Sequence, residues 1–175
     1  DLSSLSSVAA CAKAFEERSK TLHVLINNAG VQPLAREVSK DGTELNFAVN
    51  FLAPVLLTEL LLPTLVRSAP ARIINVVSQM YAQASIDLTD IELARNFNRY
   101  RAYANSKLGL LLFTKILAKE FAGKNVTVNA VHPGVIRTKL SLEALGKSNP
   151  LVKVLFPLLK MGSPEKGAKG SVFLA

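Results

Sequence analysis

Short apolar runs alternate with longer amphipathic stretches along this chain. Three runs, at 23–27, 71–77 and 125–131, are compact and contain β-branched residues, and none of them carries a charged residue except Arg72. Runs that are apolar on both faces are typical of strands in a parallel sheet with helices on each side. We therefore expect three buried parallel strands.

Amphipathic stretches around these runs predict helices. A helix is expected over about 3–18 after a serine-rich cap, one over about 43–67, and one over about 100–122 that Gly123 closes. Pro63 is expected to bend or end the last turns of the second helix. Alternating strands and helices predict an open α/β sheet with right-handed crossovers, built as one domain over 1–175.

The ends of the predicted strands indicate where a ligand would bind. Asn28, Ser78 and Pro133 each follow a predicted strand. Open α/β sheets bind ligands in the crevice beyond the carboxyl ends of their strands. We therefore expect these three residues to converge on one crevice.

Composition and charge narrow the classes of function. Hydrophobic residues make up 49% of the chain and charged residues 19%, which is ordinary for a globular domain. The net charge of +8 comes from scattered Lys and Arg without a run of five, so no nucleic-acid partner is expected. An anionic cofactor, or weak attraction to an acidic membrane surface, accommodates the charge more simply. No secretory leader is visible, and no run offers the roughly 20 uninterrupted apolar residues of a membrane span.

The rarer reactive side chains point to packing rather than to chemistry. Cys11 is the single cysteine, so no internal disulfide can form, and it is expected to be a small, half-buried helix residue. His23 and His132 lie far apart without Cys, Asp or Glu at ligand spacing, so no metal site is predicted. His132 is expected to pack or to form a hydrogen bond.

Tyr103 and Lys107 form the strongest local signal, at the start of the third predicted helix. Residues four apart lie on one helical face, so the phenol and the ammonium can share a site. Free tyrosine has a pKa of about 10, and a nearby cation would lower that pKa and make the phenol a usable acid or base. The spacing alone would also fit a solvent-exposed helix face without a catalytic role. Neither Tyr81 nor Tyr100 has a lysine four residues later, so they do not share this pattern.

Other motifs surround this pair in a fixed order along the chain. They are Asn27-Asn28-Ala29-Gly30, Asn50 in VNFLAPVLLT, Ser78 after RIINVV, Tyr103 with Lys107, and Pro133-Gly134 in VNAVHPGVIRT. The ordered set resembles the short-chain dehydrogenase/reductase family over nearly the whole chain. The opening DLSSLSSV and the helix SKLGLLLFTKILAKEF resemble its retinol-dehydrogenase-like branch.

This resemblance implies a Rossmann-type, doubly wound parallel sheet and an NAD(P)-dependent oxidoreductase that interconverts an alcohol and a carbonyl. It implies that Tyr103 transfers the proton, that Lys107 holds the nicotinamide ribose and lowers the Tyr103 pKa, and that Ser78 binds the substrate oxygen. It also implies that Asn50 anchors a water linked to Lys107, although Asn50 could simply cap or bridge backbone. The implied cofactor-binding residues are Asp1, Leu2, Asn28, Ala29, Gly30, Tyr103, Lys107, Pro133, Gly134, Val135 and Thr138.

Two alternatives use the same fold. One is a nucleotide-sugar epimerase or dehydratase, which also uses a Tyr/Lys pair, and the other is a catalytically silent binding protein. Ser85 competes with Ser78, but only Ser78 directly follows a predicted strand. Asn27 is expected to bridge backbone or side chains rather than to touch a ligand.

The sequence also departs from the family pattern. It holds no GxxxGxG or GxGxxG turn, so the first strands and the glycine-rich turn are expected to be missing, with the chain truncated at both ends. Tyr103 follows Ser78 by 25 residues, and the extra segment resembles an insertion of the retinol-dehydrogenase-like branch. The stretch 141–163 is expected to be the substrate loop, or an ordinary buried helix. Its apolar character suits a retinoid, a steroid, a long-chain aldehyde or a membrane surface.

The resemblance also bears on the cofactor, the oligomeric state and the location. The retinol-dehydrogenase-like branch favours NADP over NAD. The sequence is compatible with a homo-oligomer formed through the long helices and with peripheral membrane contact. It is also compatible with either a cytoplasmic or a membrane-associated location.

We predict that the 175-residue chain binds NADPH weakly or not at all. The reason is that its sequence holds no glycine-rich turn to receive the pyrophosphate. Isothermal titration calorimetry of this chain with NADPH should show no saturable heat at micromolar concentrations. Tight binding would contradict the prediction.

Overall fold

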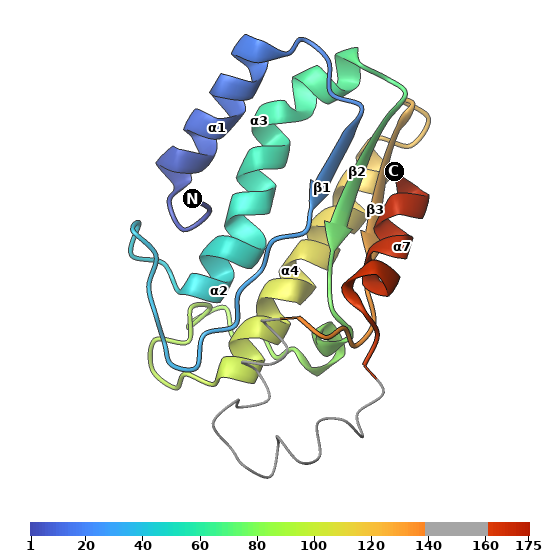
Figure 1. Ribbon diagram of the computed structural model, residues 1–175. Coiled ribbons are helices and arrows are strands. Elements are labelled where there is room, and N and C mark those ends of the chain that lie inside the picture. Colours follow the sequence, from blue (N-terminus) through green and yellow to red (C-terminus); the bar gives the residue numbers. More distant parts are fainter. Residues whose placement is uncertain (139–160) are drawn as a thin grey trace.

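Three parallel strands form the centre of the molecule (Figure 1). The structure is a computed structural model, and it describes residues 1–138 and 161–175. The strands are β1 Val24–Asn27, β2 Ala71–Val76 and β3 Val126–Val131, in the order β1-β2-β3. Ile26 pairs with Ile74, and Ile74 pairs with Asn129. Each predicted strand is present, shorter by one residue.

Helices connect and flank the strands. They are α1 Leu5–Arg18, α2 Leu45–Phe47, the π-helix η1 Ala48–Leu52, α3 Ala53–Arg67, the 3-10 helix η2 Gln79–Gln83, α4 Arg99–Glu120 and α7 Pro164–Leu174. Side-chain oxygens cap their first turns, as Ser4 does for α1 and Asn98 for α4. Gly123 follows α4 with φ +79°, a backbone conformation that favours glycine and ends the helix.

The two faces of the sheet carry different helices. Alternate residues of a strand point to opposite faces, so Val126 and Val128 share a face while Val131 points to the other. The first face packs on α3 and α4 in one apolar cluster that includes Leu65 and Ile73. Val131 instead meets Gly170 of α7, since a Cβ at that glycine would lie 2.7 Å from its side chain. Helices on both faces of a parallel sheet confirm the α/β, Rossmann-type prediction.

Sequence-based expectations about two helix residues are corrected by the structure. Of the two outcomes expected for Pro63, it does not end the helix, because α3 continues to Arg67. Cys11 is exposed rather than half-buried. Its neighbour Ala12 is 3% exposed and packs in the core cluster, and one residue along a helix turns the side chain by about 100° away from that face.

The segment Leu45–Arg67 is long and apolar enough to cross a membrane, by length and composition alone. It has 23 residues, and an 18-residue window within it has a mean hydropathy of 1.8. In this fold its inner residues Leu61 and Leu65 are 4% and 0% exposed and pack against the sheet and α4. The segment therefore serves as a core helix of the domain described here.

Strand β1 lies at an edge of the described sheet. It pairs with β2 only, and Ile26 is 41% exposed. This arrangement leaves an apolar strand at the edge of the described sheet. An unpaired strand edge offers free backbone donors and acceptors to another chain, which makes it a site for association.

We predict that Leu65→Ala destabilises the chain by about 2–5 kcal/mol, because it leaves a cavity between α3 and the sheet. Leu60→Ala on the same helix is the control, since Leu60 is 38% exposed and should cost much less. Urea unfolding followed by circular dichroism measures both. Equal losses from the two variants would contradict this account of the core.

Candidate active site

A cavity of about 630 Å³ opens at the carboxyl ends of the three strands. The residues after β1, β2 and β3 meet there, as the strand order predicted. Its lining comprises Asn28, Ala29, Gly30, Gln32, Val76, Val77, Ser78, Gln79, Met80, Tyr103, Lys107, His132, Pro133, Gly134, Val135, Ile136 and Thr138. The structure thus brings together most of the residues that the sequence singled out.

Tyr103 of α4 and Ser78, two residues after the end of β2, line the same cavity. The Tyr103 residue is 8% exposed. Burial raises the pKa of its phenol above the ordinary value, and the hydrogen-bonding influence of Ser78 opposes that rise. The expected lowering of this pKa is therefore not found, because desolvation is the largest influence on it.

Lys107 lies one turn further along the same helix and is almost completely buried. It is 3% exposed, and its ammonium donates a hydrogen bond to the Val76 carbonyl at 2.9 Å. The ammonium lies 5.8 Å from the centroid of the Tyr103 ring. Burial lowers the pKa of Lys107 to about 8, so the group remains mostly charged at neutral pH.

Asn50 fixes the loop that follows β1. Its carboxamide accepts from the Val31 N–H at 2.8 Å and donates to the Val31 carbonyl at 2.9 Å. It also donates to the Ser106 hydroxyl at 3.1 Å, so both of its amide hydrogens are committed. Asn50 lies in the π-helix η1, an irregularity often found at functional sites. Its visible role is to hold the loop against α4, and the water it was expected to anchor remains a prediction.

Asn27 forms a buried polar bridge beneath the cavity. Its amide nitrogen donates to Thr58 of α3 at 3.0 Å and to the Asn75 oxygen at 2.8 Å. Asn75 donates in turn to Thr114 of α4 at 2.8 Å. The bridge ties β1 and β2 to both covering helices, in agreement with the structural role expected for Asn27.

The predicted cofactor residues fall into two groups. Gly30 lies against the catalytic side chains, since a Cβ there would stand 3.3 Å from Asn50 Oδ1 and 3.5 Å from Lys107 Nζ. Asp1 and Leu2, by contrast, are not part of the cavity lining. The Asp1 carboxylate instead forms an ion pair with Lys40 at 3.0 Å. A role for Asp1 and Leu2 beside an adenine remains a prediction.

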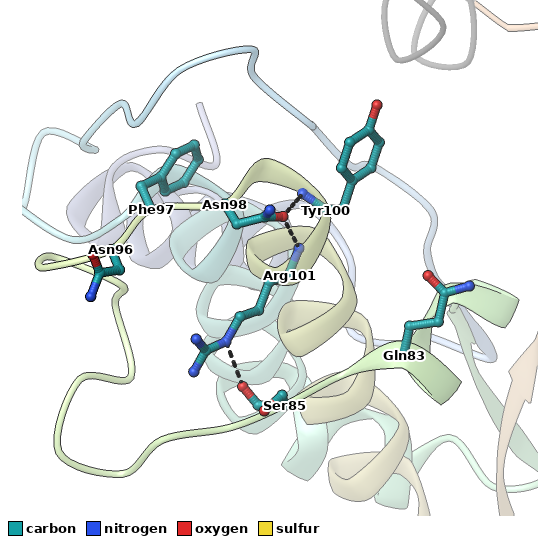
Figure 2. Close-up of a pocket in the computed structure, with 7 residues that line it drawn as sticks. All are labelled: Gln83, Ser85, Asn96, Phe97, Asn98, Tyr100 and Arg101. Atoms are coloured by element: carbon teal, nitrogen blue, oxygen red, sulfur yellow. Dashed lines mark hydrogen bonds between the residues drawn. The ribbon is translucent and has the colours of Figure 1, made fainter.

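The extra segment between Ser78 and Tyr103 shapes a second, more open pocket (Figure 2). Arg101 donates from Nε to the Ser85 carbonyl at 2.8 Å, and the Asn98 side chain accepts from the first backbone N–H groups of α4. Asn105 holds the same loop, because its carboxamide pairs with both the N–H and the carbonyl of Ser85. Ser85 therefore supports the loop, whereas Ser78 contacts Tyr103.

Several residues of the site were not found from the sequence. Gln32 and Met80 line the cavity, and Asn105 positions the loop beside it. Asn105 stands between Tyr103 and Lys107, so its place within that motif was the available signal. His132 was expected to pack or to form a hydrogen bond, and its Nδ1 accepts from the Gln79 N–H at 3.3 Å. The predicted substrate loop, 141–163, lies almost wholly outside the described residues.

The fold and the cavity together define a Rossmann-type α/β domain with serine, tyrosine and lysine at the carboxyl edge of its sheet. The chain belongs to the short-chain dehydrogenase family, which it matches over residues 1–147. Membership confirms the resemblance on which the site assignments were based.

The chain is also similar to individual proteins. It is 41% identical to retinol dehydrogenase 14 of Homo sapiens, over all of this chain and 52% of that protein. It is equally identical to human retinol dehydrogenase 13, over all of this chain and 54% of that one. Among solved structures, the RhlG/NADP active-site complex of Pseudomonas aeruginosa is similar with a TM-score of 0.72 and 28% identity, covering 98% of this chain and 66% of that one. The chain spans about half the length of the curated relatives it matches.

We predict that the burial of Lys107 gives stability a defined pH dependence. Below pH 8 the folded state carries the full free-energy cost of the buried ammonium. Above pH 8 Lys107 loses its proton in the folded state while it keeps it in the unfolded state, so this cost falls as the pH rises. The free energy of unfolding of the wild type, relative to Lys107→Met, should therefore rise by about 1–2 kcal/mol between pH 7 and pH 9.5. Urea unfolding at both pH values measures it, and a difference that does not change with pH would contradict the assignment.

Proposed function

We propose that this protein is an NAD(P)-dependent oxidoreductase that interconverts an apolar alcohol and its carbonyl. The observation that carries the proposal is that Ser78, Tyr103 and Lys107 line one cavity, in which the Tyr103 side chain and the Lys107 ammonium are both buried. A hydroxyl pair and a fixed cation are the groups needed to bind a carbonyl oxygen and to supply its proton. Family membership supports the same activity.

Tyr103 and Ser78 act on the substrate oxygen. Because both residues line the same cavity, a carbonyl oxygen placed between their hydroxyls would accept from both. Those two hydrogen bonds draw electron density from the carbonyl carbon and stabilise the charge that develops on oxygen during reduction. Tyr103 then transfers its proton to that oxygen, and the reverse transfer serves oxidation.

Tyr103 holds its proton at neutral pH, because free tyrosine has a pKa of about 10 and burial raises that of Tyr103 above the ordinary value. It can therefore act directly as a general acid when a carbonyl is reduced. Lys107, mostly charged at that pH, stabilises the phenolate left after the proton has moved.

The cavity also fits a nicotinamide cofactor, which when bound supplies or accepts the hydride. Gly30 leaves space beside Asn50 and Lys107 that a side chain would fill. Lys107 would hold the ribose hydroxyls, and Pro133, Gly134 and Thr138 form the opposite wall. NADP is the first candidate, since the RhlG relative was solved as an NADP complex.

An apolar substrate fits the remaining walls. Val77, Met80 and Ile136 line the cavity beside the reacting groups. Relatives at 41% identity are retinol dehydrogenases, which supports a retinoid, and the apolar walls suit a steroid or a long-chain aldehyde equally.

Two further expectations about partners remain proposals. Leu112 and Ile116 on α4 are 46% and 67% exposed, which supports a homo-oligomer formed through this helix. Size-exclusion chromatography with light scattering would detect that oligomer. Liposome flotation would detect the peripheral membrane contact.

We predict that Tyr103→Phe in the full-length protein lowers kcat for an apolar aldehyde by about 10²–10⁴-fold, because the proton donor is lost. Tyr100→Phe is the matched control, as Tyr100 lies on the same helix but is 51% exposed and outside the cavity lining. Oxidation of NADPH, followed by absorbance, measures both variants. Unchanged activity in Tyr103→Phe would contradict the mechanism, and product formation without net cofactor turnover would indicate an epimerase.

A further inference from the structure

Gln32 carries a buried polar atom that the protein leaves without a partner. Its side chain is 6% exposed and it lines the catalytic cavity. Among the described residues, no acceptor lies within hydrogen-bonding distance of its amide nitrogen. The carboxamides of Asn27 and Asn50, buried to a similar extent, are both hydrogen-bonded. Gln32 therefore differs from the amides that hold the site together.

A buried donor without an acceptor costs free energy, and native proteins contain few of them. The backbone beside Gln32 is held, because Asn50 binds both the N–H and the carbonyl of Val31, the residue directly before it. An unpaired donor that lines a cavity on an anchored loop is available to an acceptor that arrives with a ligand.

We propose that Gln32 is a specificity-determining residue whose amide N–H binds an oxygen of the substrate other than the oxygen that reacts at Tyr103. This inference rests on the proposed function. The cavity lining also includes the apolar residues Val76, Val77 and Met80, so the buried amide of Gln32 would select and orient an apolar substrate by one additional oxygen. The substrate class is thus an apolar aldehyde or ketone that carries a second hydroxyl, carbonyl or ether oxygen.

The first test uses the ligand-free chain. Gln32→Met removes the unpaired polar group with little change in volume, and it should raise the melting temperature by about 2–4 °C. Asn27→Leu is the matched control, since Asn27 is 7% exposed but fully paired, and it should lower the melting temperature. A lower melting temperature in Gln32→Met would show that its amide already has a partner, which overturns the inference.

The second test measures selectivity in the full-length protein. Two aldehydes of equal chain length are compared by kcat/KM, one with and one without an additional hydroxyl. The wild type should prefer the hydroxylated aldehyde by roughly threefold to tenfold, the value of one neutral hydrogen bond. In Gln32→Met this ratio should fall to about one. Gln32→Glu keeps the shape of the side chain but loses the donor. It should therefore show no preference for a third aldehyde that carries an ether oxygen in place of the additional hydroxyl. Gln83→Met, a change at an exposed glutamine, is the control.

The outcomes separate this inference from the proposed function. If the wild type reduces both aldehydes equally, or if Gln32→Met keeps the preference, the inference alone is overturned. If Gln32→Met weakens NADPH binding and leaves the aldehyde ratio unchanged, the acceptor belongs to the cofactor and the substrate assignment is wrong. If the wild type reduces neither aldehyde, the proposed function fails and the inference fails with it.

Discussion

The burial of one ammonium group governs the arrangement of this site. Lys107 is 3% exposed and relies on the Val76 carbonyl, so α4 must lie close against the carboxyl end of β2. A charge in that position is costly, which is why its pKa falls to about 8. The same helical turn delivers Tyr103 to Ser78. The position of the reacting phenol thus follows from the docking of the helix that carries the cation.

Carboxamides from the helices fix the loops at the strand ends. Asn50 pairs with the backbone of Val31, and Asn105 pairs in the same way with the backbone of Ser85. Each side chain supplies an acceptor and a donor to the N–H and the carbonyl of one residue, as a neighbouring strand would do. Loops that would otherwise be free at the edge of the sheet are therefore held against α4. The helices supply hydrogen bonds to these loops beyond the ends of the short strands.

The sequence predicted the parts of this structure that depend on local patterns. The apolar runs gave the three strands, and the ordered motifs placed Ser78, Tyr103 and Lys107 beside one cavity. The details that depend on packing were missed. Spacing revealed a cation near Tyr103 but not the desolvation that raises its pKa. Periodicity placed Cys11 on a helix but not on its exposed side, and no pattern marked Gln32 as an unpaired amide.

The π-helical turn at Ala48–Leu52 has a consequence for how this region tolerates changes in length. Such a turn holds one residue more than an α-helical turn, and each residue rotates a helix by about 100°. Because the wide turn takes up the additional residue, the segments on its two sides keep about the relative rotation of a regular helix that is one residue shorter. One residue added to a regular helix would instead rotate one side by about 100°, and either the core face of α3 would leave the sheet or Asn50 would leave Val31. The π-helical turn thus lets one continuous helix serve both the scaffold and the loop.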